Sequence, residues 1–373
     1  MNELTTFEAI EVVTRILRAF KELAIMFWGF TGIGKSEIAR QSVRALGNGG
    51  ELWSPKPGVM PTGALEIYGS WGLIDMRVSL REPTDLLGLP DLKCESVRWV
   101  VPDELPVVGQ EHRFPKDGIL FLDELTHAST AMQNACYSLI LDRRVGPHQL
   151  MPGWRIVAAS NSGAENANTF PMSAPLRNRF VHLHIRPSLD AFKQWALANG
   201  VDTRIIAFLN FNPEFLHKAT DHGEEGFPTP RAWTVASKLL GIFNDQQIER
   251  ALAGAVGPGT ATVLSGFLAM NDSSELNVDT VRLLAGKVKC PKLTLERPDH
   301  AWALTGRVTA AVRERPERLA SAIGFYCSSA WKEVREIGRT GLADLKHLVG
   351  QEGFSQALAQ HMEQCAKFYG DLL

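Results

Sequence analysis

The sequence predicts an α/β fold in which a parallel, doubly wound sheet is flanked by helices and followed by an all-helical region. Apolar segments at 23–28 and 119–122 have the length and continuity of buried parallel strands, and 73–78 and 154–159 are two further expected strands. Segments with helical spacing of apolar residues lie between them, whereas from Pro187 onward only helical patterns remain. Strands that alternate with helices are typical of a parallel sheet covered on both faces.

The remaining elements of the first half follow in order. Thr5 to Phe20 has apolar residues at helical spacing, and Thr5 with Glu8 offers an N-terminal capping box. Gly47 to Gly63 is rich in glycine and proline, which predicts an exposed loop. Asp85 to Pro115 is interrupted by prolines and is expected to be irregular and functional. A helix is expected over Ser129 to Leu141.

The second half is expected to contain only helices, with an exposed connection at 221–226. The sequence thus divides into a nucleotide-binding core over 1–186, a helical lid over 187–245 and a C-terminal helical region over 246–373. We expect the helices beyond about residue 275 to contact a partner or a neighbouring subunit. The helical segments are Ser188 to Asn199, Thr203 to Phe211, Pro230 to Phe243, Ala251 to Met270 and most of 278–373.

Residues 29–36, Gly-Phe-Thr-Gly-Ile-Gly-Lys-Ser, fit the phosphate-binding motif G-x-x-x-x-G-K-[ST]. The motif follows an expected strand and opens a helical segment, which is the context it requires. Its glycines let successive backbone N–H groups face a phosphate, Lys35 can reach the β- and γ-phosphates, and the Ser36 hydroxyl can ligate Mg²⁺. A chance glycine-rich turn is the alternative. The residues assigned to nucleotide binding are Gly29, Thr31, Gly32, Ile33, Gly34, Lys35, Ser36 and Glu37.

Two acids follow the apolar segment 119–122. Asp123 and Glu124 come at the carboxyl end of an expected central strand, where open α/β sheets bind ligands. Asp123 is placed to hold Mg²⁺ through its water shell, and Glu124 to act as general base on the attacking water. A solvated acidic turn is the alternative, but the phosphate motif upstream argues against it. The two motifs together predict a nucleoside-triphosphate hydrolase.

Composition limits the other classes of function. Thirty-nine basic and forty-one acidic residues give a formal net charge of −2, so the footprint of a strongly basic nucleic-acid-binding protein is absent. The sequence has no apolar run of the roughly eighteen residues that a membrane-spanning helix needs, and acids near the amino terminus argue against a secretory signal. We therefore expect a cytoplasmic protein.

The cysteines and histidines show no metal-ligand pattern. His182 and His184 share one strand face, but without a nearby third ligand we expect ordinary strand residues there. The five cysteines are far apart, and we expect reduced thiols, mostly buried in helices. They are Cys94, Cys136, Cys290, Cys327 and Cys365.

Two polar residues resemble the sensors of AAA+ ATPases. Asn161, at the end of the strand after the acidic one, resembles the first sensor, which helps to position the attacking water. Arg231, within Pro228 to Trp233, resembles the second sensor, an arginine at the start of a lid helix that contacts the nucleotide. The structural alternatives are an ordinary turn asparagine and a solvated arginine. The resemblance implies ATP as the nucleotide, with Mg²⁺, and catalytic roles for both residues.

The segment Pro175 to Phe180 resembles the one that carries the arginine finger in AAA+ proteins. Arg179 is in the family's Arg-Phe position, Arg177 competes for the role, and an ion pair at the sheet edge is the structural alternative. A guanidinium supplied by a neighbouring subunit is worth about 10³–10⁵ in rate, because it stabilises charge on the transferred phosphoryl group. The resemblance therefore implies hydrolysis within an assembled ring.

Within AAA+, four segments are similar to the MoxR branch: 75–77, 85–90, 133–139 and 143–146. The resemblance covers about residues 5 to 270. It implies a homohexameric, chaperone-like motor that acts on a protein substrate, often with a von Willebrand factor A domain protein. The sequence lacks a clear aromatic–hydrophobic–glycine pore loop, and we expect Trp99 to be packed rather than to face a pore.

Two other functions compete with remodelling of a partner protein. A nucleic-acid motor would use the same nucleotide motifs, but the near-neutral charge and the lack of sustained Lys/Arg runs argue against it. A nucleotide-switched scaffold with slow hydrolysis stays open, because every motif named above would serve it equally well.

Overall fold

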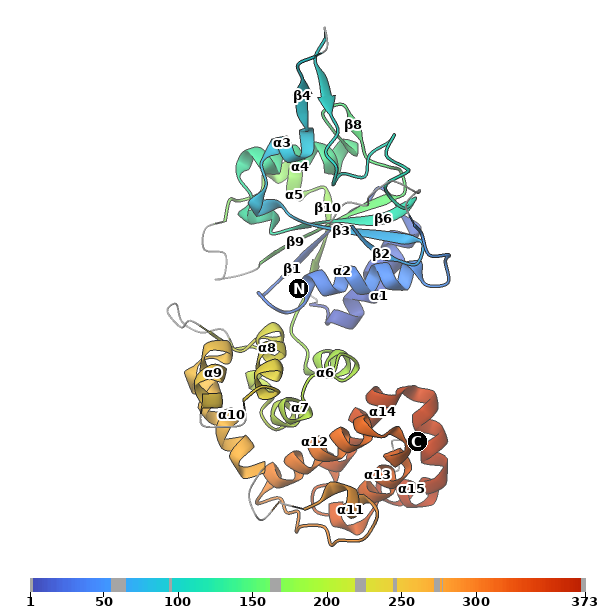
Figure 1. Ribbon diagram of the computed structural model, residues 1–373, viewed down its shortest axis with the longest axis vertical. Helices are drawn as coiled ribbons and strands as arrows, with labels where there is room; N and C mark the ends of the chain where they lie inside the picture. Colours follow the sequence, from blue (N-terminus) through green and yellow to red (C-terminus); the bar gives the residue numbers. More distant parts are fainter. Residues whose placement is uncertain are drawn as a thin grey trace. The chain divides into compact units, whose positions relative to one another are not determined.

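The computed structural model describes residues 3–54, 65–93, 96–161, 169–218, 226–243, 247–271, 276 and 278–369. The chain divides into two compact units, Met1–Arg186 and Pro187–Leu373. The first unit contains the sheet, and the described part of the second unit contains helices and no strand (Figure 1).

A six-stranded sheet in the order β10-β1-β9-β6-β3-β2 forms the centre of the first unit. Every neighbouring pair is parallel except β2 and β3, so the predicted α/β fold with a mostly parallel sheet is confirmed. The antiparallel edge strand β2 was not predicted, because its four half-buried residues follow a Gly/Pro-rich segment. The strands are β1 (Ala24–Gly29), β2 (Leu65–Tyr68), β3 (Trp71–Arg77), β6 (Asp117–Asp123), β9 (Trp154–Asn161) and β10 (Phe180–His184).

The strand order explains where a site can form. β9 lies between β1 and β6, so the carboxyl ends of these three strands are neighbours at one edge. Gly29 at the end of β1 pairs with Asn161 at the end of β9. Asp123 ends β6, and Arg77 of β3 pairs with it on the other side.

Helices cover both faces of the sheet (Figure 1). α1 (Thr6–Ala19) and α2 (Lys35–Gly47) pack on one face, where Ile38 joins strand residues in a buried cluster. α1 begins with the capping box expected from Thr5 and Glu8. The other face carries α3 (Pro83–Leu87), α4 (Thr130–Asp142) and α5 (Ala174–Arg177).

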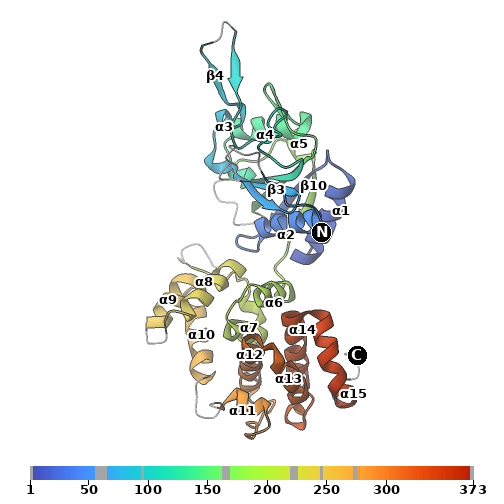
Figure 2. The same cartoon turned by 45° about the vertical axis from the view of Figure 1, so that its right-hand side comes forward.

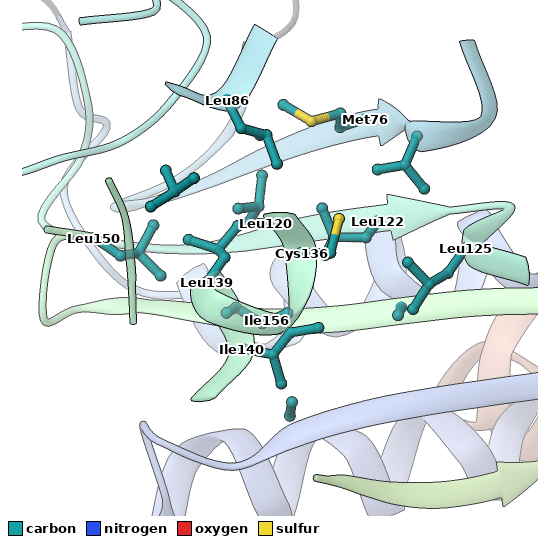
Figure 3. Close-up of a cluster of buried hydrophobic side chains, with 14 of the residues drawn as sticks. Met76, Leu86, Leu120, Leu122, Leu125, Cys136, Leu139, Ile140, Leu150 and Ile156 are labelled. Atoms are coloured by element: carbon teal, nitrogen blue, oxygen red, sulfur yellow. The ribbon is translucent and has the colours of Figure 1, made fainter. Parts of the chain in front are cut away.

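The core on the second face is mostly aliphatic, with Phe114, Trp154 and Phe180 among its buried residues. α4 faces β6 through its buried side chains, and Ser129 caps its first turn. Figure 3 shows this contact, in which the even-numbered residues of β6 point toward α4. The alternation of strand side chains leaves Phe121 and Asp123 on the opposite face, toward α2. The residues of Figure 3 include Leu120, Leu122, Cys136, Leu139 and Ile140.

The segment expected to be irregular contains a hairpin. β4 (Leu89–Asp91) and β5 (Arg98–Val100) pair antiparallel and extend away from the sheet (Figure 1). Trp99 is 37% exposed, so the expectation that it is packed is wrong. A two-stranded ribbon on its own cannot bury its side chains. A second short hairpin, β7 (Arg144–Val145) with β8 (His148–Gln149), follows α4.

The second unit consists of helices joined by turns (Figure 2). The predicted helical segment Ala251 to Met270 is helical except at Gly257, whose φ of +83° ends one helix before Pro258 begins the next. The helices are α6 (Leu189–Ala198), α7 (Thr203–Phe211), α8 (Pro230–Leu240), α9 (Gln247–Val256), α10 (Pro258–Asn271), α11 (Thr280–Leu284), α12 (Pro298–Glu314), α13 (Leu319–Tyr326), α14 (Arg335–Leu358) and α15 (Met362–Tyr369).

A buried ion pair joins the predicted lid to the predicted C-terminal region. Lys193 Nζ of α6 lies 3.0 Å from Asp344 Oδ1 of α14. Asn210 of α7 donates to the other carboxylate oxygen at 2.9 Å. The boundary at residue 245 stays a prediction, but helices on both of its sides share buried contacts.

Two cysteines correct the expectation of reduced thiols. Cys327 and Cys365 form a disulfide, with Cα atoms 5.2 Å apart. Their separation of 38 residues carries no sequence signal, and the packing of α13 against the C-terminal helices brings them together. Cys136 and Cys290 are free, and Cys94 lies outside the described residues.

In the part of the chain that the structure describes, no helix is long and apolar enough to cross a membrane. The predicted connection at 221–226 lies outside the described residues except for Gly226. Of the predicted loop, 48–54 contains no helix or strand and is mostly exposed, and 55–63 lies outside the described residues.

Candidate functional site

The loop between β1 and α2 takes a shape that depends on its glycines. Gly32 and Gly34 have φ of +75° and +97°, which side-chain-bearing residues rarely adopt. A Cβ on Gly29 would lie 2.5 Å from the Ile33 Cδ1 and 2.8 Å from the Ile185 carbonyl oxygen. Ile33 is buried and anchors the loop to the core, whereas Thr31 is half-buried.

Lys35 brings the loop and the end of β9 together. Its side chain is only 9% exposed, and Nζ donates to the carbonyls of Gly29 and Phe30 at 2.8 and 2.9 Å. Nζ also donates to Asn161 Oδ1 at 2.9 Å. An ammonium group has three donors, so these contacts hold the charge at the mouth of the loop. Lys35 and Asn161 are 126 residues apart in the sequence.

Ser36 and Asp123 form the second contact of the site. The Ser36 hydroxyl donates to Asp123 Oδ2 at 3.4 Å. Burial raises the pKa of Asp123, and the charge of Glu124 raises it further, against the lowering effect of the Glu124 backbone N–H. A hydroxyl beside a carboxylate is a donor set that Mg²⁺ accepts, and a cation would offset the cost of burying the carboxylate charge. These two residues therefore fit a bound Mg²⁺.

Two residues at and just after the carboxyl end of β3 hold the Glu124 side chain. The Glu124 backbone has φ +59°, in the left-handed region. Ser79 donates its hydroxyl to Glu124 Oε2, and Arg77 Nε lies 3.6 Å from Oε1. The carboxylate is therefore occupied by groups at the end of β3. Sequence reasoning missed both contacts, although the position of Arg77 and Ser79 at the end of an expected strand could have drawn attention to them.

Arg40 of α2 connects two further acids that sequence reasoning did not assign. Its Nη2 lies 2.9 Å from Asp75 Oδ2, and its Nε donates to both Glu66 oxygens at 3.2 Å. Burial raises the pKa of Asp75, and the charge of Asp123 raises it further. Glu37, in the first turn of α2, accepts from Gln41 Nε2 at 3.1 Å.

The arginine-finger candidates are exposed at the far edge of the sheet. Arg177 ends α5, Arg179 precedes β10, and both side chains are exposed. His182 Nε2 bonds the Arg177 carbonyl at 2.7 Å, and Trp28 Nε1 donates to His182 Nδ1 at 2.8 Å. Among the described residues, the Arg179 guanidinium makes no hydrogen bond or ion pair with the residues of the loop.

The contacts of Arg231 and of the two histidines of β10 are made with residues outside the phosphate loop. Arg231 is exposed in the first turn of α8, in the second unit, and its carbonyl accepts from Thr234. His182 and His184 both stack against Trp28. Groups of three or more His, Cys, Asp or Glu that could hold a metal are absent from the described residues.

Neither a family profile nor a curated protein matches the chain. NtrX from Brucella abortus is 17% identical over 93% of this chain and 69% of its own, with a TM-score of 0.34. The same protein in complex with ATP is 15% identical over 91% and 67%, with a TM-score of 0.33. A Cytophaga hutchinsonii protein described as a candidate ATPase is 13% identical over 97% and 92%, with a TM-score of 0.33. At these values, similarity carries no argument about activity, and the assignment of a function rests on the geometry of the site.

Proposed function

We propose that this chain binds ATP with Mg²⁺ at the loop 29–36 and hydrolyses it. The observation that carries the proposal is the convergence of Lys35, Asn161 and the Ser36–Asp123 pair at the adjoining ends of β1, β9 and β6. A buried ammonium group, a loop of forced left-handed glycines and a helix N-terminus in one place form an anion site. The half-buried Asp123 beside it supplies the ligand that a nucleotide-bound cation needs.

Each residue then has a distinct task in hydrolysis. The loop N–H groups bind the phosphates, and Lys35 exchanges its carbonyl partners for phosphate oxygens. Ser36 and Asp123 hold Mg²⁺, which when bound neutralises charge on the phosphates. Glu124 accepts a proton from the attacking water, and Asn161 orients that water. Arg179 from a neighbouring subunit and Arg231 of the lid stabilise the transferring phosphoryl group.

We further propose the AAA+ type, with a MoxR-like homohexameric ring that remodels a partner protein, together with a von Willebrand factor A domain protein. Only the order and spacing of the motifs support this extension. The cytoplasmic location likewise stays a prediction from the sequence. Nucleic acid stays the less favoured substrate because the net charge is −2.

One observation favours the second candidate, a nucleotide-switched scaffold with slow hydrolysis. The Glu124 carboxylate is bonded to Ser79 and lies beside Arg77. While these contacts persist, the carboxylate is turned toward β3 and is not free to act as a base. Basal turnover would then be limited by the release of Glu124.

Lys35→Ala tests the nucleotide assignment. The substitution removes a charge-assisted contact to phosphate worth about 1.5–3 kcal/mol, which is roughly a 10- to 150-fold loss of ATP affinity. Binding of a fluorescent ATP analogue and phosphate release measure the effect, with Lys21→Ala, an exposed lysine of the same unit, as the control. Wild-type binding and turnover in Lys35→Ala would refute the proposed site.

A further inference from the structure

Three carboxylates line the sheet beneath α2. Glu66, Asp75 and Asp123 come from the adjacent strands β2, β3 and β6. The register pairs Asp75 with Phe121, two residues before Asp123, and Glu66 with Leu73, two residues before Asp75. Side chains two residues apart on a strand share a face, so all three acids point toward α2. Asp75 is the middle member and the neighbour of Asp123.

Arg40 links this row to the phosphate-binding helix. It follows Ser36 by four residues, one helical turn, so the two side chains share the face of α2 that looks at the sheet. The guanidinium contacts Asp75 at 2.9 Å and Glu66 at 3.2 Å. One cation therefore serves two acids, and Ser36, a turn earlier, contacts the third.

The two acids that Arg40 contacts differ in their other neighbours. Glu66 of the outer strand β2 also accepts a hydrogen bond from the Tyr68 hydroxyl at 2.5 Å. Two donors, Arg40 and Tyr68, therefore hold Glu66. Asp75 is contacted by Arg40, its strand β3 pairs with β6, which Asp123 ends, and the negative charge of Asp123 raises the pKa of Asp75 in addition to burial. A divalent cation at Ser36 and Asp123 would relieve the repulsion between Asp75 and Asp123, and it would leave Glu66 almost unaffected.

We propose that Asp75 and Arg40 are positioning residues for the metal at the nucleotide site. Arg40 fixes α2 over the sheet at the level of Ser36, and the Asp75 carboxylate accepts hydrogen bonds from the water shell of the Mg²⁺ that Ser36 and Asp123 hold. The inference rests on the proposed function. It assigns to Asp75 a contribution to cation affinity, and none to the recognition of the nucleotide itself.

Metal dependence of nucleotide binding tests the inference without any measurement of hydrolysis. Affinity for a fluorescent ATP analogue is measured in EDTA and over a series of Mg²⁺ concentrations, for wild type, Asp75→Asn and Glu66→Gln. Loss of an outer-shell carboxylate typically costs 10-fold or more in metal affinity. We expect Asp75→Asn to need about 10-fold more Mg²⁺ for half-maximal binding, with unchanged affinity in EDTA. Glu66→Gln, which loses the same Arg40 partner farther from Asp123, should match wild type.

Each other outcome contradicts the inference or its basis. An unchanged Mg²⁺ requirement in Asp75→Asn, an equal rise in Glu66→Gln, or an equal loss of binding in EDTA would each make Asp75 a structural brace only. If Asp75→Asn does not fold, Arg40→Lys replaces it: the ammonium cannot bridge both acids, so a smaller rise in the Mg²⁺ requirement is expected, and none would overturn the inference. Absence of nucleotide binding by the wild type at every Mg²⁺ concentration would instead refute the proposed function.

Discussion

Side chains of the candidate site are held by hydrogen bonds to residues that lie far away in the sequence. Glu124 is engaged by Ser79, 45 residues upstream, and Lys35 by Asn161, 126 residues downstream. The first contact restrains the proposed base, and the second holds the proposed phosphate-binding cation. At the scale of the residue, the resting site is therefore organised around internal contacts that a nucleotide and its water would have to replace.

The Ser79 contact gives a test of the restraint on Glu124. Ser79→Ala removes one hydrogen bond to a charged group, so the carboxylate is released more easily and ATP turnover should rise by about 10-fold. Glu124→Gln should keep ATP affinity and lose about 10²–10⁴ in turnover, because an amide cannot accept the proton of the water. Phosphate release under saturating ATP measures both. A fall in turnover for Ser79→Ala would show that Ser79 positions the base instead of restraining it.

The pKa of Asp123 predicts how stability depends on pH. Burial raises this pKa above its ordinary value of 3.8, so the folded state binds the proton more tightly than the unfolded state. The charged carboxylate therefore costs stability, and that cost grows as the pH rises from 3.8 through the raised pKa. Without Mg²⁺, Asp123→Asn should melt at a higher temperature than wild type at pH 7, with a difference that shrinks at acidic pH. A lower melting temperature of the variant in EDTA at pH 7 would contradict this assignment of the pKa shift.

Among the elements, α6 and α14 are joined by a buried ion pair, and the same lysine of α6 makes an exposed ion pair within its own helix. Lys193 lies 3.0 Å from Asp344, whose side chain is 3% exposed, and 3.7 Å from Asp190, whose side chain is 91% exposed. The two carboxylates therefore differ strongly in burial although they share one lysine. Burial raises the pKa of Asp344, opposed by Lys193, so the charge of that carboxylate depends on its partner.

Substitutions around Lys193 should differ sharply in cost. Lys193→Met leaves Asp344 buried without its cation, which typically costs about 3–5 kcal/mol. Asp190→Ala removes only a solvent-exposed pair worth about 0–1 kcal/mol. Urea unfolding monitored by circular dichroism gives both free energies. Equal losses in the two variants would mean that the buried pair is not what holds α6 to α14.

At the scale of the whole molecule, the exposed Arg179 raises the question of assembly. It lies next to the edge strand β10, while the phosphate loop follows the adjacent strand β1. Within the described residues of one chain, its side chain makes no contact with the loop by hydrogen bond or ion pair. Since β10 and β1 are parallel, Arg179 lies at the amino end of its strand and the loop at the carboxyl end of the other, so we propose that Arg179 acts on the nucleotide of a second copy of the chain.

Mixing inactive variants tests that requirement. Arg179→Ala should bind ATP normally and hydrolyse it about 10³-fold more slowly, because the guanidinium acts on transition-state charge. Glu124→Gln is inactive for a different reason, so a mixed assembly contains some interfaces with an intact Glu124 on one side and an intact Arg179 on the other. Partial recovery of turnover on mixing is the expected result. Failure to recover, with subunit exchange shown by a fluorescent label, would assign the role to Arg177 or to the same chain.

The sequence by itself determined the elements whose signal is local. The run of apolar residues before Asp123 and the glycines of residues 29–36 predicted β6 and the loop, because periodicity and turn chemistry act between neighbours. The capping box at Thr5 followed from the same kind of rule. The short edge strand β2 and the hairpin at 89–100 were not predicted. Their residues are half-buried or exposed, so no continuous apolar pattern marks them.

Tertiary structure alone decided which of these elements meet. Strand order placed Asn161 between the loop and Asp123, and the register of β3 against β6 placed Arg77 and Asp75 beside Asp123. The Cys327–Cys365 disulfide likewise depends on helix packing. A sequence pattern reports whether a segment is buried and with what period, but contacts between distant segments arise only when strands choose neighbours and register, and that choice minimises the free energy of the whole sheet and its covering helices.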